Sequence, residues 1–184
     1  MSSKLLKSGV VALTLAATTA VAHAGVSFVG GAAMYSDKPI AANAVNAPKL
    51  TTLVAAVMAA GLVDTLAGPG PLTMFAPTNF DFSQLPDATV ETLLKPENKG
   101  QLTKVLTAHV VSANITRANL RSAVKENGGS YSFQTVSRDQ LTAKQLGLAI
   151  TITDESGRTA FITNPDVGQA NGVVHVVNKV LLPK

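Results

Sequence analysis

The 184-residue chain contains no cysteine and no tryptophan, and only 4% of its residues are aromatic. Without cysteine the chain cannot form disulfide bonds, thiolate metal sites or cysteine nucleophiles, and it cannot be lipidated at an N-terminal cysteine. Charged side chains are also scarce, at 14% of the residues, and the formal charge is +4. The length is typical of one domain, which aliphatic packing must hold together.

The N-terminus has the pattern of a secretory signal peptide. Lys4 and Lys7 precede an apolar run at 10–17, and small residues follow up to the sequence Ala-His-Ala that ends at Ala24. The run is too short for a permanent membrane span, and Ala-x-Ala is typical of a cleavage site. We therefore expect residues 1–24 to be removed and the product to be secreted or periplasmic.

The apparent basicity belongs mostly to this signal peptide. Its removal takes away two lysines and no acid, which leaves a formal charge of +2. With so little charge, no Lys/Arg cluster and two tyrosines for stacking, we expect no binding to nucleic acid. No later segment approaches the roughly 18 apolar residues of a membrane-spanning helix. We expect a monomer or weak homo-oligomer that does not span a membrane.

Apolar periodicity and capping residues divide the remaining chain. Residues 25–36 are rich in glycine and precede Pro39, which suits a first helical turn, so we interpret them as a flexible N-terminal arm before a domain at 37–184. An alternative treats the arm as an assembly segment. Thr116 is expected to N-cap a helix rather than to complete a glycosylation sequon. Helical spacing predicts helices over 50–62, 87–94, 96–110 and 116–125.

Strands are expected mainly in the second half of the chain. Residues 148–153 and 159–163 alternate in polarity around a turn at 154–157, which predicts a β-hairpin. Residues 173–182 are apolar on both faces and therefore suit a central strand. Further strands are expected at 72–76 and 131–136. Helices first and strands later indicate an α+β domain.

Two segments resemble the signature blocks of the fasciclin domain. They are residues 72–82 (LTMFAPTNFDF) and residues 171–183 (NGVVHVVNKVLLP), in the family's order, and the resemblance extends over roughly residues 40–183. It implies an α+β wedge in which a mixed β-sandwich packs with several α-helices. It also implies a secreted or surface location, and adhesion or matrix contact without known catalysis in most members. Within these blocks we assign structural roles to Thr78, Asn79, Gly172 and His175.

One difference from the family concerns the residue before His109. Many members have Tyr-His at this point, and in animal members the pair has been tied to receptor binding, but here the residue is Ala108. We therefore do not expect receptor-type adhesion through that pair. There is also no Arg-Gly-Asp tripeptide.

The two histidines outside the signal peptide are candidate functional residues. His109 ends an apolar helical stripe, which favours a core histidine bonded to a cap or backbone group near Thr78 and Asn79, with a partner contact as the alternative. His175 lies in a valine-rich strand, where a structural role is favoured. Because neither histidine has the spacing of a metal or catalytic site, we expect no metal, no cofactor and no enzymatic activity.

Asn178, Lys179 and Leu182 lie in a stretch that resembles the Asn-Lys-Asp-Ile-Leu-like segment that family members use in adhesion. The alternative is the end of a buried strand in which only Lys179 reaches solvent. Our main hypothesis is a secreted or periplasmic binding protein, without catalysis, in cell-surface adhesion or matrix association with a protein or glycan partner. The alternative function is a carrier of an apolar small molecule such as a carotenoid, a lipid or a tetrapyrrole.

Overall fold

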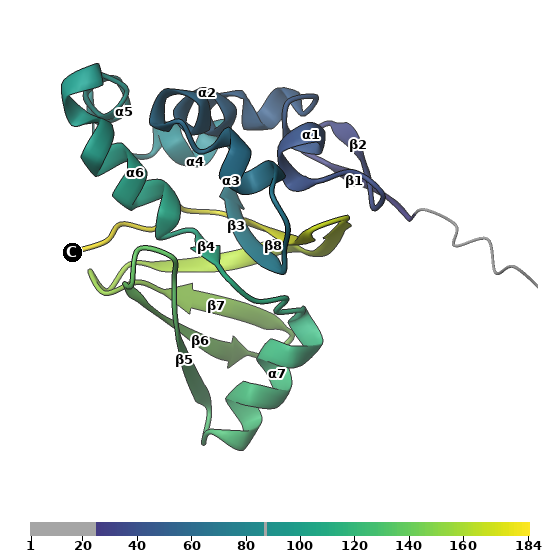
Figure 1. The fold of residues 1–184 in the computed structure, drawn as a ribbon. Coiled ribbons are helices and arrows are strands. Elements are labelled where there is room, and N and C mark those ends of the chain that lie inside the picture. Colours follow the sequence, from purple (N-terminus) through teal and green to yellow (C-terminus); the bar gives the residue numbers. More distant parts are fainter. Residues whose placement is uncertain (1–24, 87) are drawn as a thin grey trace, which may run out of the picture.

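The computed structural model describes residues 25–86 and 88–184, so the expected signal peptide lies outside the described residues. Figure 1 shows helices above a central group of strands, and the helix α7 with the strands β5–β7 below it. Within the described residues, no helix combines the length and the apolar composition that a membrane crossing requires.

Most of the helices are short and lie on one side of the sheet. Their bounds are α1 (Ile40–Ala44), η1 (Pro48–Leu50), α2 (Thr51–Ala60), α3 (Val63–Ala67), α4 (Asn79–Ser83), α5 (Thr89–Leu93), η2 (Pro96–Asn98), α6 (Lys99–Thr107) and α7 (Arg117–Glu126). The helix predicted over 50–62 is η1 plus α2, which ends where Gly61 adopts a left-handed φ of 72°. Thr116 N-caps α7 as expected, since its side chain accepts from the backbone N–H of Asn119.

The helix predicted over 96–110 is shorter than expected. It consists of η2 and α6 and ends at Thr107, because Val110 and Val111 leave the helix to pair with the strand at residues 72–77. His109 therefore lies in the turn beyond the helix and not on a helical stripe.

Apart from a separate two-stranded hairpin near residue 30, the strands form one mixed sheet in the order β4-β3-β9-β8-β7-β6-β5. Their bounds are β3 (Leu72–Pro77), β4 (Val110–Val111), β5 (Ser130–Gln134), β6 (Gln140–Leu146), β7 (Ala149–Thr153), β8 (Thr159–Gln169) and β9 (Gly172–Val177). β9 is central, parallel to β3 and antiparallel to β8, but it ends at Val177 instead of reaching residue 182. The α+β class is confirmed.

The two parts of this sheet share the long strand β8. Its first residues pair with β7, the rest pairs with β9, and the register shifts twice between Ile162 and Val167. Bulges of this kind bend a strand. The expected sandwich is thus built from one continuous sheet that changes direction at β8.

Each part of the sheet has its own hydrophobic core. Val174 and Val176 of β9 face the helices, where they pack in one cluster with Leu53 of α2. Val177, on the opposite face of the same strand, packs with Phe75 in a second cluster beneath which α7 lies. The period-two alternation of β9 therefore divides the domain into a helical half and a β half (Figure 1).

Residues 25–36 form a β-hairpin rather than the flexible arm we expected. β1 (Val26–Val29) and β2 (Ala32–Tyr35) pair around two glycines with positive φ. Val29 and Met34 are buried in the helical core. The buried Asn43 fixes the hairpin, because its side chain accepts from the Tyr35 N–H at 3.0 Å and donates to the Tyr35 carbonyl at 2.7 Å. One buried residue from each strand thus anchors the hairpin, although Val26 and Phe28 are exposed.

Candidate functional site

The candidate adhesion stretch follows β9 instead of extending it. Asn178 and Lys179 are exposed, Val180 and Leu181 are buried, and Leu182 is half-buried. The stretch is therefore neither a paired strand nor an extended exposed segment. Only the first two residues of the stretch are exposed.

Asn178 holds this exposed pair against β8. Its side-chain oxygen accepts from the Phe161 N–H at 2.7 Å, and its own N–H donates to the Phe161 carbonyl at 3.2 Å. The Asn178 amide thus takes the place of a ladder bond after β9 has ended. It positions Lys179 next to the strand that carries Phe161.

The buried part of the stretch is anchored by two side chains from distant elements. The Leu181 N–H donates to Nε2 of His109 at 2.9 Å, and the Leu182 N–H donates to Oδ2 of Asp154 at 2.8 Å. Asp154 also accepts from the N–H of Arg158 at 2.9 Å. The sequence had indicated only a turn at Asp154, because nothing local shows that its carboxylate reaches the C-terminal segment.

His109 is a structural residue in this geometry and not a contact residue. Its side chain is 1% exposed, and its Nδ1–H donates to the Val105 carbonyl at 2.8 Å, which leaves Nε2 to accept from Leu181. Burial lowers its pKa to about 4. A partner could not reach this ring, so the contact role is wrong. The expected bonds near Thr78 and Asn79 are not those the ring makes.

His175 is buried in the β half. Its Nε2–H donates to the Ile115 carbonyl at 2.7 Å, its Nδ1 accepts from the Asp166 N–H at 3.2 Å, and its ring stacks on Phe75 with centroids 5.6 Å apart. Burial lowers its pKa as well. Both ring nitrogens are occupied by backbone groups, which is the geometry of a structural histidine.

Thr78 and Asn79 organise the start of α4. The N–H and the hydroxyl of Thr78 both donate to Oδ2 of Asp81, at 2.7 and 2.6 Å. Asn79 reaches the start of α2, where it accepts from the Thr52 N–H at 2.9 Å and donates to the Thr51 hydroxyl at 2.9 Å. The first signature block thereby fixes α4 against α2.

Gly172 and its neighbour Asn171 join the second block to the first. A Cβ at Gly172 would lie 1.9 Å from the Leu72 carbonyl oxygen, so this close approach of β9 to β3 requires glycine. The Asn171 side chain accepts from the Ile40 N–H at 3.0 Å and donates to the Leu66 carbonyl at 2.8 Å. Asn171 thus ties α1 and α3 to the sheet, a role that its turn-forming sequence did not reveal.

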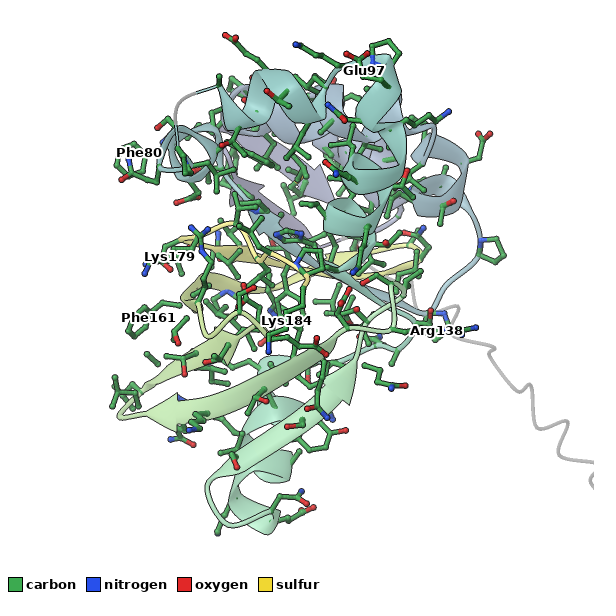
Figure 2. The ribbon with its side chains drawn as sticks, turned by 90° about the vertical axis from the view of Figure 1, so that its left-hand side faces the viewer. Phe80, Glu97, Arg138, Phe161, Lys179 and Lys184 are labelled. Carbon is green, nitrogen blue, oxygen red and sulfur yellow. The ribbon has the colours of Figure 1, made fainter. Side chains whose placement is uncertain are left out.

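The exposed residues of the stretch lie on a face that carries two phenylalanines. Phe80 of α4 is 71% exposed and Phe161 of β8 is 36% exposed. Figure 2 shows Phe80, Lys179 and Phe161 pointing outward on the same side of the molecule, with Lys179 between the two rings. We call these three residues the Lys179 face.

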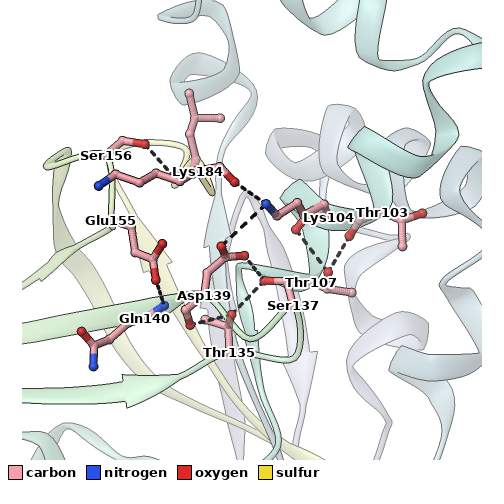
Figure 3. Close-up of polar contacts among 11 residues, drawn as sticks. Thr103, Lys104, Thr107, Thr135, Ser137, Asp139, Gln140, Glu155, Ser156 and Lys184 are labelled. Atoms are coloured by element: carbon pink, nitrogen blue, oxygen red, sulfur yellow. Dashed lines mark hydrogen bonds and ion pairs between the residues drawn. The ribbon is translucent and has the colours of Figure 1, made fainter.

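The polar side chains of a cluster near Lys184 bond to one another (Figure 3). Lys104 lies 4.0 Å from Oδ1 of Asp139 and also donates to the Lys184 carbonyl, while the Ser137 hydroxyl donates to Oδ2 of Asp139 at 2.5 Å. The cluster ties α6 and the C-terminal segment to the loop between β5 and β6. Among residues 25–86 and 88–184, no group of three or more His, Asp or Glu side chains is placed to hold a metal ion.

An apolar crevice lies between α1, α2 and α3. Its walls include Val45, Val54, Met58, Val63 and Leu66, and its volume is about 40 Å³. Sites for drug-sized molecules have volumes of about 300–1,000 Å³. The crevice as it stands cannot enclose a carotenoid or a tetrapyrrole.

Comparison with known proteins identifies the family of this chain. The model of the fasciclin domain matches residues 48–183, nearly three quarters of the chain. The chain belongs to the fasciclin family. The pairing of β3 with β9 and the cap of α4 are therefore made by the two signature blocks of a fasciclin domain.

Relatives and a solved structure agree with this family. The chain is 42% identical to Protein sll1483 of Synechocystis sp., over 72% of this chain and 67% of that protein. It is 31% identical to the cell surface glycolipoprotein MPB83 of Mycobacterium bovis, over 84% of this chain and 64% of that protein. The structure of a FAS1 domain pair from the insect cell adhesion molecule Fasciclin I matches with a TM-score of 0.69 at 19% identity, over 79% of this chain and 51% of that one. This last match bears on the fold alone.

Proposed function

We propose that this fasciclin-domain protein acts outside the cytoplasm as a binding protein without catalysis, in cell-surface adhesion or matrix association. The signal-peptide pattern at residues 1–24 supports the location, as does similarity to a mycobacterial cell-surface glycolipoprotein. The buried His109, His175 and Asp154 are bonded to backbone groups, so they are engaged in the fold and not offered to a substrate. Turnover of a substrate by the purified protein would contradict this proposal.

We propose that the partner binds at the Lys179 face. A lysine between two exposed phenyl rings suits an anionic group next to an apolar surface, which proteins and acidic glycans both offer. Aromatic side chains, phenylalanine among them, are enriched at protein interfaces relative to the rest of the surface. The face is also rigid, because Asn178 and the two anchors behind Leu181 and Leu182 fix the chain on which Lys179 stands.

The test is binding of purified variants to the surface fraction of the producing cells and to immobilised acidic glycans. We expect Lys179→Glu and Phe161→Ser each to weaken binding at least about tenfold, because each removes a central contact of the face. Lys95→Glu is the matched control, since Lys95 is an exposed lysine outside this face. Unchanged binding by Lys179→Glu, or an equal loss with Lys95→Glu, would exclude the Lys179 face as the binding site.

The carrier function remains the second candidate, with less support. The crevice between α1, α2 and α3 is apolar, but at about 40 Å³ it would have to open widely to hold a carotenoid, a lipid or a tetrapyrrole. We therefore expect protein from its native source to release no coloured or lipid ligand into organic solvent. A stoichiometric extracted ligand would favour the carrier instead.

A further inference from the structure

Two leucines are exposed at the turn between β6 and β7. Leu146 is 64% exposed and Leu148 is 80% exposed, and Gly147 between them has a φ of 59°. The flanking strands bury Ala143 and Ile150 in the β half, so the hairpin is firmly held while its tip projects. A single exposed leucine is common, but two at one rigid turn form a compact apolar tip.

Two arginines from α7 meet at the same turn. The Nη2 atoms of Arg117 and Arg121 both donate to the Leu148 carbonyl, at 2.6 and 2.7 Å. Each guanidinium has five N–H donors, and because Nε of Arg121 is buried, the donors that remain for another acceptor are mainly those of the Nη atoms. Within the part of the chain that the structure describes, no carboxylate lies within 4.0 Å of either guanidinium. Two like charges are thus held together without a neutralising partner, which is unfavourable unless an anion binds.

Further charges near this tip come from β6 and from the end of α7. Lys144 is exposed two residues before Leu146, and Lys125 is exposed one turn after Arg121 on α7, where the exposed Glu126 follows it. The acid at the N-terminus of α7 is Asp166, and its Oδ1 accepts from the backbone N–H of Arg117 at 2.7 Å, so it serves as a cap.

A hollow of about 110 Å³ lies next to the Arg117 side chain. It is lined by Arg117, Ile150, Ile162 and Thr163 among others, and so combines a cation and a hydroxyl with apolar walls. A phosphate group that bonds to the free donors of Arg117 has space there.

We propose that the β6–β7 turn and the adjoining side of α7 form a contact surface for membranes that contain anionic phospholipids. Leu146 and Leu148 enter the boundary between headgroups and acyl chains, while Arg117 and Arg121 bind lipid phosphates. A bilayer supplies both features in the required order, with phosphates outside and hydrocarbon beneath. This surface goes beyond the binding proposed for the Lys179 face and does not depend on it.

The chain itself allows a position-specific test, because it contains no tryptophan. A single tryptophan introduced by Leu148→Trp reports only on the tip, and one introduced by Phe28→Trp reports on an exposed position of β1, outside both proposed surfaces. All variants are prepared with one N-terminus, verified by mass spectrometry, so that residues 1–24 cannot cause a difference between them. Vesicles contain either equal parts of phosphatidylglycerol and phosphatidylcholine, or phosphatidylcholine alone.

We expect the L148W emission to shift to the blue with the anionic vesicles and not with the neutral ones, because the tip enters a less polar environment. The F28W emission is expected to stay unchanged in both. An absent shift for L148W, or an equal shift for F28W, would overturn the proposal.

Vesicle sedimentation then separates the apolar from the electrostatic contribution. Replacing both exposed leucines (L146S/L148S) is expected to lower partitioning onto anionic vesicles at least about tenfold. R117Q/R121Q is expected to lower it about fivefold per charge, whereas K95Q/K99Q, in the helical half, has little effect. Far-UV circular dichroism checks that every variant is folded. If L146S/L148S binds vesicles normally, or if R117Q/R121Q weakens binding to heparin more than it weakens binding to anionic vesicles, the surface is not a lipid site.

Discussion

The helical half and the β half of this fasciclin domain are stabilised in different ways. In the helical half, α1, α3, α4 and α5 have five residues each, too few to be stable alone. Side-chain amides of Asn43, Asn79 and Asn171 tie α1, α3 and α4 to other elements. In the β half, continuous ladders join β5 to β8 and aromatic rings stack beneath them. Regular hydrogen bonding thus supports one half, and particular tertiary contacts support the other.

Surface features follow the same division. The helical half, whose short helices leave gaps between them, has the apolar crevice. The β half has a projecting hairpin tip with two arginines behind it. The Lys179 face lies where the halves meet, since Phe80 belongs to a helix and Phe161 to β8. Phe80 follows β3 in the chain and Lys179 follows β9, so the arrangement of this face also depends on the join between β3 and β9.

The largest expected effect is the loss of that join. Gly172→Ala places a Cβ 1.9 Å from the Leu72 carbonyl oxygen, and because the clash is with backbone, β9 must move away from β3. We expect the free energy of unfolding to fall by more than about 4 kcal/mol, measured by urea denaturation. Gly100→Ala is the control, since a Cβ there meets nothing within 4 Å and α6 favours alanine by up to about 1 kcal/mol. Equal stability of the two variants would mean that the halves are not joined at Gly172.

An intermediate effect is expected from acid. Burial lowers the pKa of His109 from 6.5 to about 4, so the unfolded chain binds its proton first as the pH falls. Stability that is present above pH 6.5 is therefore lost as the pH decreases to about 4, by about 3 kcal/mol for this group. Protonation also removes the acceptor of the Leu181 N–H, so hydrogen exchange at Leu181 should accelerate before exchange in β6 and β7.

The variant His109→Gln separates the contribution of His109 to the pH dependence of stability from that of the other titratable groups. Glutamine has no charge to gain, so the variant should lose less stability than wild type between pH 6.5 and 4, although it is weaker at neutral pH. His175, whose pKa is also lowered by burial, continues to titrate in the variant and sets the remaining slope together with the carboxylates. Parallel stability curves for the two proteins would contradict a buried neutral His109.

The smallest effect is expected at a single amide of the helical half. Asn79→Ala removes the bonds to Thr51 and Thr52 and should cost about 1–2 kcal/mol, measured by urea denaturation. Asn46 is the matched control, because its side chain bonds only to the Ala42 carbonyl one turn away on the surface. Asn46→Ala is expected to change stability by less than about 0.5 kcal/mol. If Asn79→Ala and Asn46→Ala lower the free energy of unfolding equally, long-range hydrogen bonds of side-chain amides do not stabilise the helical half.

Predictions from sequence succeeded where local pattern and final environment agree. The cap at Thr116, the helix within 50–62 and the hairpin of β7 and β8 were predicted because turn chemistry and periodicity act over a few residues. The prediction failed for residues 25–36, where glycines suggested an arm although Val29 and Met34 are buried in the helical core. β6 was not predicted, because its polar residues give little apolar signal.

The candidate site shows the same limit. Lys179 could be selected from its motif, but the exposure of Phe80 and Phe161 beside it depends on how α4 and β8 are placed. The C-terminal anchors could not be foreseen, since His109 and Asp154 are 72 and 28 residues from the N–H groups that they accept. The local sequence of an aspartate at a turn is the same whether its carboxylate accepts only from that turn or also from the backbone N–H of a distant segment.

The sequence by itself determined the family, the α+β class and the dependence on aliphatic packing, because two long motifs and the lack of cysteine are properties of the chain alone. Only the tertiary structure decided that His109 is an internal anchor, that β9 stops at Val177, and that Arg117 and Arg121 converge on the exposed turn at Leu148. The physical reason is that burial and hydrogen bonding depend on which groups meet in space, and here the decisive partners are separated by tens of residues.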